Sequence, residues 1–180
     1  MHLATKDQRL AGLRRLQTTA PGLCRVYFCS CWAYSVTGFC LILCQDSMPP
    51  LCRSTGVMSL RAYGLLLILQ GPCSYANDAV ATFGYPVLGG EKLVRFVDRA
   101  CACSNFANMV AAVLAFPSDG GEHAGLRLVI GIMLLATCAV AFPASKSYEI
   151  SGRMRGFLAW HSVWHYVPNG LALLWVALWL

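Results

Sequence analysis

Five long apolar runs constrain the fold of this chain more than any other feature of its sequence. A helix needs about 20 consecutive apolar residues to cross the hydrocarbon core of a bilayer, and clusters of polar residues, Pro or Gly separate the runs. The runs cover about residues 26–44, 62–83, 93–116, 126–142 and 156–180. The sequence therefore predicts an all-α fold, a polytopic transmembrane helix bundle of about five spans.

Composition supports the same prediction. Of the 180 residues, 57% are apolar and 12% are charged, whereas soluble domains carry about a quarter charged residues. The apolar excess is therefore expected to face lipid, so an integral, multi-pass membrane protein with the lipid bilayer as partner is predicted. Residues 1–25 are predicted to be a basic flank and residues 26–180 a single transmembrane domain. The cations lie in short flanks, so no nucleic-acid partner is expected.

The Lys and Arg residues predict the orientation, because basic residues accumulate on the cytoplasmic side of membrane proteins. With the N-terminus in the cytoplasm, the side with most cations holds Lys6, Arg9, Arg14, Arg15, Arg25, Lys92, Arg95, Arg99, Lys146, Arg153 and Arg155. The other side holds Arg53, Arg61 and Arg127. A distribution of eleven cations on the cytoplasmic side and three on the other side agrees with five spans and a cytoplasmic N-terminus.

The sequence also predicts where some helices end and how most of the cysteines behave. The third run is expected to end at the turn cluster of residues 117–121 and the fourth at Pro143, and a kink is expected at Pro168. Most of the ten cysteines lie in apolar segments, where Cys behaves as a small hydrophobic residue. The pairs Cys29–Cys31 and Cys101–Cys103 lack the spacing of a zinc ribbon and are weak metal signals.

Few ionisable residues lie inside the runs, and each is a functional hypothesis because charge is costly in a membrane. They are Asp78 in the second run, Asp98 in the third, and His161 and His165 in the fifth. The predicted topology brings all four into the cytoplasmic half of the membrane. At 1.5 Å per residue, each lies roughly 7–14 Å from its helix end.

The spacing of the two histidines suggests a metal site. His161 and His165 are four residues apart, so both face one side of a helix and can reach one ion. Zn²⁺ held by two imidazoles and a carboxylate would form a hydrolytic site. Asp78 and Asp98 are alternative third ligands, and the other carboxylate would orient a ligand or take a proton from water. Ser74 would position water or the developing oxyanion.

Each candidate also has a simpler structural interpretation. The histidines are flanked by Trp and Tyr residues and can belong to an aromatic belt at the membrane surface. Asp98 suits the first turns of its helix and can pair with a neighbouring base. Asp78 can form a polar contact between helices with Asn77 and Ser74 nearby.

The motif of residues 70–78, Asp98 and the His161-x-x-x-His165 pair together resemble the alkaline ceramidase and progestin/adiponectin-receptor superfamily of membrane hydrolases. The residues that match its pattern are Ser74, Asp98, His161 and His165. The resemblance implies a zinc site and hydrolysis of an amide in a lipid such as ceramide. The chain departs from the pattern at Asp78, where the family has a histidine, and in its five runs, where the family has seven spans.

Two functional hypotheses follow. The first is a zinc-dependent membrane hydrolase acting on a lipid amide or ester, with Asp78, His161 and His165 as metal ligands and Asp98 and Ser74 as catalytic residues. The second is a non-enzymatic multi-pass protein, either a partner subunit or a small proton-coupled carrier in which Asp78 and the histidines relay protons. The sequence leaves the substrate, the organelle and the oligomeric state open.

Overall fold

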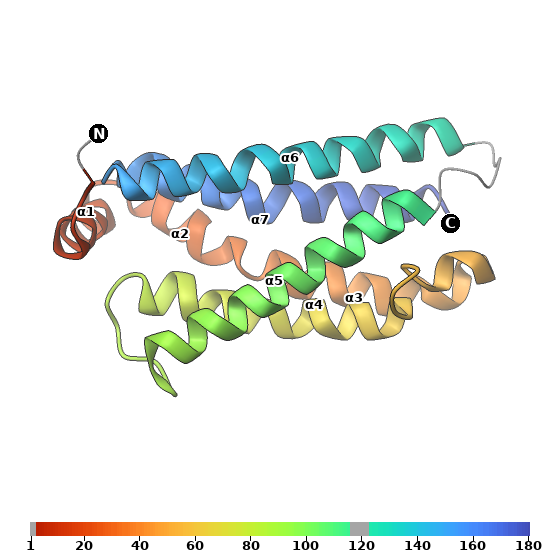
Figure 1. The fold of residues 1–180 in the computed structure, drawn as a ribbon, viewed down its shortest axis with the longest axis horizontal. Coiled ribbons are helices and arrows are strands. Elements are labelled where there is room, and N and C mark those ends of the chain that lie inside the picture. The colour runs from red at the N-terminus through yellow and green to blue at the C-terminus, as the bar shows by residue number, and fades with distance from the viewer. Residues whose placement is uncertain (1–2, 116–122) are drawn as a thin grey trace.

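The computed structural model describes residues 3–115 and 123–180, and these residues form helices, turns and one isolated β-bridge. The all-α prediction is therefore confirmed for this part of the chain. In Figure 1 the long helices lie roughly along the longest axis of the molecule, and successive long segments run in opposite directions. The α-helices are α1 (Lys6–Thr19), α2 (Pro21–Ser30), α3 (Ala33–Cys44), α4 (Leu60–Ser74), α5 (Gly90–Ala115), α6 (Ala124–Ile150) and α7 (Met154–Ala177).

The helices follow the five apolar runs, and the first and fourth runs differ from the prediction. The first run begins earlier, at Pro21, and is divided into α2 and α3 by a turn at Cys31 and Trp32. The predicted stop at Pro143 is wrong, because α6 continues through this proline to Ile150. The predicted turn cluster at 117–121 lies outside the described residues. Pro168 lies inside α7, which continues to Ala177.

Helix α1 was not predicted, although its first residues carry a recognisable start signal. Thr5 and Gln8 form a capping box, in which each side chain accepts a hydrogen bond from the other residue's backbone N–H. The helix lies at the end of the bundle near the N-terminus (Figure 1). Lys6 donates to Glu91 of α5 at 2.8 Å, which holds the pKa of that carboxyl below its ordinary value. Arg9 pairs with Glu149 of α6 at 3.4 Å.

Helix α4 passes into a π-helix, η3 (Tyr75–Ala81), just after Pro72. Proline has no N–H, so the carbonyl of Ile68 loses its helical donor. The Ser35 hydroxyl of α3 donates to that carbonyl instead, at 2.8 Å. A Cβ on Gly71 would lie 2.1 Å from the Ser35 oxygen, so only glycine permits this approach. The wider turn that follows carries Asp78, and π-helical segments are frequent at functional sites.

Two apolar clusters enclose the middle of the bundle. One includes Tyr34, Leu41, Leu67 and Val176 of α3, α4 and α7, and the other includes Leu13, Tyr27, Phe83, Phe157 and Leu158 near α1 and α2. Between them lies a group of buried polar residues, which are Ser30, Gln70, Ser74, Asp78, Asp98, Asn105, Ser162 and His165. The polar residues are therefore held in the interior by packed apolar residues at both ends.

The outer surface of the bundle is rich in large apolar side chains. Exposed examples on α3 to α6 are Val36, Phe39, Leu43, Leu65, Leu69, Phe96, Leu114, Ile132, Met133 and Val140. Two helical segments, Pro21–Ser47 and Ala124–Ile150, are long and apolar enough to cross a membrane. This observation is weak evidence for membrane association, because core helices of soluble proteins have the same properties.

Candidate metal and proton-transfer site

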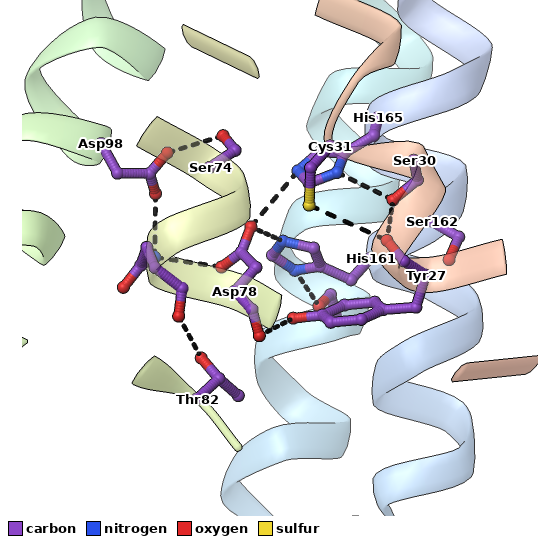
Figure 2. A network of polar contacts seen from close by, with 12 residues as sticks. Tyr27, Ser30, Cys31, Ser74, Asp78, Thr82, Asp98, His161, Ser162 and His165 are labelled. Carbon is purple, nitrogen blue, oxygen red and sulfur yellow. Dashed lines mark hydrogen bonds and ion pairs between the residues drawn. The ribbon is translucent and has the colours of Figure 1, made fainter. Parts of the chain in front are cut away.

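Asp78 and two histidines meet in the interior of the bundle, although 83 residues of sequence separate Asp78 from His161. Asp78 lies on η3, and both histidines lie on α7. The Oδ2 atom of Asp78 is 3.0 Å from Nε2 of His161 and 3.6 Å from Nε2 of His165. Figure 2 shows the two imidazoles pointing toward the carboxylate. Because His165 is only 2% exposed, the alternative of an aromatic belt at the membrane surface does not describe this residue.

Cys31 joins this group from the turn between α2 and α3. Its Sγ, a carboxylate oxygen of Asp78 and a ring nitrogen of His165 all lie within 4.8 Å of one another, and all three residues are buried. Thiolate, carboxylate and imidazole are the ligand types that Zn²⁺ accepts. A buried group of Cys31, Asp78 and His165 can therefore hold a metal ion. His161 is not part of this group, so its role as a ligand stays a prediction.

Ser30 determines which ring nitrogen of His165 has a lone pair that can bind a metal ion. The Ser30 hydroxyl donates its only proton to the backbone carbonyl of Tyr27 at 2.7 Å. Ser30 must therefore accept from Nδ1 of His165, which lies 3.0 Å from its oxygen. In a neutral imidazole, Nε2 then carries a lone pair that faces Asp78 across 3.6 Å. A lone pair facing a carboxylate favours a cation between them, so the residues present fit a metal ion.

His161 has a different hydrogen-bonding arrangement. Its Nε2 lies at 3.0 Å from Asp78, whose ionised carboxylate only accepts, so Nε2 carries the proton. Its Nδ1 is 3.1 Å from the Ser145 hydroxyl of α6, which then donates to it. The two histidines therefore face the same carboxylate as opposite tautomers. His165 is arranged as a ligand, and His161 as a proton donor.

Asp98 of α5 belongs to a neighbouring group rather than to the histidines. Its carboxylate accepts from Gln70 at 2.9 Å, from Ser74 at 2.7 Å and from Asn77 at 2.9 Å. The Asn77 amide also donates to Asp78 at 3.0 Å and so connects the two carboxylates. Asp78, not Asp98, is thus the carboxylate beside the imidazoles. The expected alternative of an ion pair between Asp98 and a neighbouring base is not found among the described residues.

A cavity of about 580 Å³ connects these residues with the surface. Its polar wall contains Ser74, Asp78, Asp98, His161 and His165. Phe106 of α5 and Phe142 and Trp164 of the α6–α7 pair form much of the apolar wall. Ligand pockets commonly have volumes of about 300–1,000 Å³ and combine apolar walls with a few polar groups. The cavity is therefore large enough for a small organic ligand to reach the polar group.

Three residues of the site received no functional role from the sequence. Cys31 belongs to the Cys29–Cys31 pair, which is only a weak metal signal, and it otherwise resembles the other cysteines in apolar segments. Ser30 is equally inconspicuous, since its partner His165 is 135 residues away. Asn77 was named from the sequence only as a polar neighbour of Asp78, and its amide does donate to that carboxylate at 3.0 Å.

Comparison of the chain with protein-family models, with curated proteins and with solved structures finds no match.

Proposed function

We propose that this protein is a metal-dependent integral-membrane hydrolase that acts on an amide or ester bond of a lipid. The observation that carries the proposal is the meeting of Cys31, Asp78 and His165 in a buried group of possible metal ligands. Asp78 and His165 also form part of the wall of a ligand-sized cavity, together with Asp98 and Ser74. The motif resemblance to the ceramidase-type membrane hydrolases agrees with this proposal.

The proposed membrane topology has five spans and a cytoplasmic N-terminus. Two of the spans are the apolar segments Pro21–Ser47 and Ala124–Ile150. Two more are α5 and α7, which contain 26 and 24 residues and are about 39 and 36 Å long at 1.5 Å per residue. Helix α4 and η3 together extend from Leu60 to Ala81. These lengths match a hydrocarbon core of about 30 Å. The outward-facing apolar side chains and the unequal distribution of Lys and Arg give further support.

Zinc is the metal that suits the ligand types best. Cys31, Asp78 and His165 would hold it, and Ser30 would keep the imidazole of His165 in the correct tautomer. A zinc ion in such a site supplies a Lewis acid and lowers the pKa of water toward neutrality. Three protein ligands also leave the open fourth position that is typical of catalytic zinc sites.

The protein residues around the ligand group have separate proposed roles. Hydrolysis adds the oxygen of water to the acyl carbon and requires a proton on the leaving nitrogen or oxygen. Asp98 would accept the proton of the attacking water, and the Ser74 hydroxyl beside it would orient the reacting group. His161 would donate a proton to the leaving group, since its Nε2–H lies in the cavity wall. The apolar wall would exclude bulk water from these steps.

The proton-coupled carrier is a second candidate, favoured by one specific observation. Asp98, Asn77, Asp78 and His161 form a continuous series of hydrogen bonds through the interior. Buried carboxylates and histidines arranged in this way occur in membrane proton relays. A carrier would need neither Cys31 nor a bound metal, so metal analysis distinguishes the two candidates.

The first test is metal analysis of the full-length protein purified in detergent. We expect about one zinc per chain. After exchange with Co²⁺, a thiolate-to-cobalt absorption band should appear in the wild type and in Cys40→Ser, and should be absent in Cys31→Ser. Cys40 is a matched control because it lies on the adjacent helix α3 outside the ligand group. Protein without stoichiometric metal would refute the proposal.

The second test measures hydrolysis of fluorogenic lipid amides and esters in proteoliposomes. We expect turnover by the wild type and losses of at least a hundredfold in Asp98→Asn and His161→Ala, within the range of general acid–base catalysis. If the protein binds metal but hydrolyses neither amides nor esters, the hydrolase proposal is wrong and the metal site still stands.

A further inference from the structure

The cavity has a basic end that the proposed chemistry does not use. Arg95 and Arg99 of α5 and Lys146 of α6 all line it. Arg95 and Arg99 are four residues apart, so their side chains leave the same face of α5. Two carboxylates line the cavity beside them, Glu149 of α6 and Asp98, which lies between the two arginines on α5. Three cations therefore face two carboxylates at this end, and the Asp98 carboxylate already accepts from Gln70, Ser74 and Asn77.

Arg95 and Lys146 already have carboxylate partners, whereas Arg99 has none among the described residues. Arg95 pairs with Glu91 at 2.5 Å, and Lys146 pairs with Glu149. Arg99 makes no hydrogen bond or ion pair within residues 3–115 and 123–180. At 1.5 Å per residue, Arg99 lies about 14 Å from the first residue of α5, where a membrane protein rarely leaves a guanidinium without an anion. Its five N–H donors match the oxygens of a phosphate group.

The opposite end of the same cavity is apolar. Along α5, the cavity wall passes from Arg95 and Arg99 to Ala102 and Phe106. Along α6, it passes from Lys146 to Phe142 and Ala139. The end of α6 lies at the same end of the bundle as the start of α5, the end where α1 lies (Figure 1). The basic residues of both helices thus lie together, and the apolar residues lie about 10 Å farther into the bundle, which is the rise of seven helical residues.

We propose that the cavity selects an anionic amphiphile, a lipid whose phosphate group binds Arg99, Arg95 and Lys146 while its hydrocarbon chain contacts Phe106 and Phe142. A neutral lipid would leave the Arg99 guanidinium without a partner. A free phosphate ion would leave the apolar wall unoccupied. The inference rests on the proposed function only for the statement that the bound lipid is the substrate. Binding itself requires no metal and no turnover.

The experiment measures equilibrium binding to the full-length protein in detergent, with two probes that contain no hydrolysable acyl bond. One probe is a hexadecyl ether of glycerol phosphate, and the other is the uncharged hexadecyl ether of glycerol. We expect the phosphate probe to bind at least tenfold more tightly, because a charge-assisted hydrogen bond contributes about 1.5–3 kcal/mol. Inorganic phosphate should displace it only weakly. Equal affinity for the two probes, or full displacement by inorganic phosphate at similar concentration, would overturn the inference.

Matched variants distinguish the cavity from general attraction to a basic protein. Arg99→Gln should weaken phosphate-probe binding about tenfold and leave the neutral probe unchanged, while Arg99→Lys should retain part of the affinity. Lys92→Gln removes the same charge from an exposed position on the same helix outside the cavity and should have little effect. If both Gln variants weaken binding equally, the inference is wrong. Because the probes cannot be hydrolysed, a failure of the hydrolase proposal leaves this result unaffected.

Discussion

Replacing Asp98 with asparagine tests the hydrogen-bond network directly. The Asp98 carboxylate accepts hydrogen bonds from Gln70, Ser74 and Asn77. A side chain at this position must therefore offer hydrogen-bond acceptors to all three donors. An asparagine side chain has one oxygen and one amino group. Its amino group must therefore face at least one of these donors.

Rotation of Asn77 does not repair the mismatch. If the Asn77 oxygen turned toward the new amino group, its own amino group would lose the bond to the Asp78 carboxylate. One to two charge-assisted bonds are lost in either arrangement, at about 1.5–3 kcal/mol each. Since neighbouring side chains adjust in part, we expect Asp98→Asn to lower the free energy of unfolding by about 2–4 kcal/mol.

The measurement is reversible unfolding of the purified protein by SDS in mixed micelles, followed by circular dichroism. Asp46→Asn is the control, because Asp46 is exposed and its side chain makes no hydrogen bond with another described residue. We expect the control to change stability by less than about 0.5 kcal/mol. In a double-mutant cycle, Ser74→Ala should couple to Asp98→Asn by about 0.5 kcal/mol or more. A stability of Asp98→Asn equal to that of the control would refute the assignment of this network.

Three other predictions follow from individual contacts. Gly38→Ala should destabilise the protein by about 1–3 kcal/mol in the same unfolding assay, because its Cβ would lie 2.4 Å from a carbonyl oxygen of α4; Gly22→Ala, with open space at its Cβ, should not. Ser30→Ala should weaken zinc binding about 10–100-fold in chelator competition, because the His165 tautomer loses its partner; unchanged affinity would contradict the tautomer argument. The lowered pKa of Glu91 means that its pair with Lys6 stabilises the protein at neutral pH, and that this stabilisation is lost as the pH falls through the lowered pKa of the carboxyl. Hydrogen exchange in α1, corrected for intrinsic rates, should therefore rise on acidification in the wild type, whereas Glu91→Gln should show the faster exchange already at pH 7.

The pattern of apolar runs predicted the helices well, but not all of their ends. Pro143 indicated a stop, yet α6 continues to Ile150 because packing against α7 compensates for one missing hydrogen bond. The break in the first run at Cys31 and Trp32 has no Pro or Gly to announce it. Helix α1 was missed although Thr5 and Gln8 formed a capping signal, because the segment has few apolar residues.

Most of the candidate site could be identified from the sequence, because placing an ionisable side chain in a membrane costs free energy. Ionisable residues in apolar runs are rare, and this alone selected Asp78, Asp98 and the two histidines. Both aspartates were possible third ligands, and the hypothesis assigned Asp78 to the metal and Asp98 to catalysis. Their roles as ligands or catalytic residues stay predictions, while their positions in the fold are now described.

What the sequence by itself determined is local: hydrophobic runs, helix type and the presence of a few polar groups among apolar residues. These properties depend on neighbours a few positions apart, so they can be read along the chain. Only the tertiary structure decided that Cys31 lies beside Asp78 and His165, that Ser30 orients one imidazole, and that Asp98 contacts Gln70, Ser74 and Asn77 rather than the histidines. Those contacts join residues from 21 to 135 positions apart. They depend on how helices pack, and Gly38, Gly71 and the π-helix after Pro72 determine that packing in three dimensions.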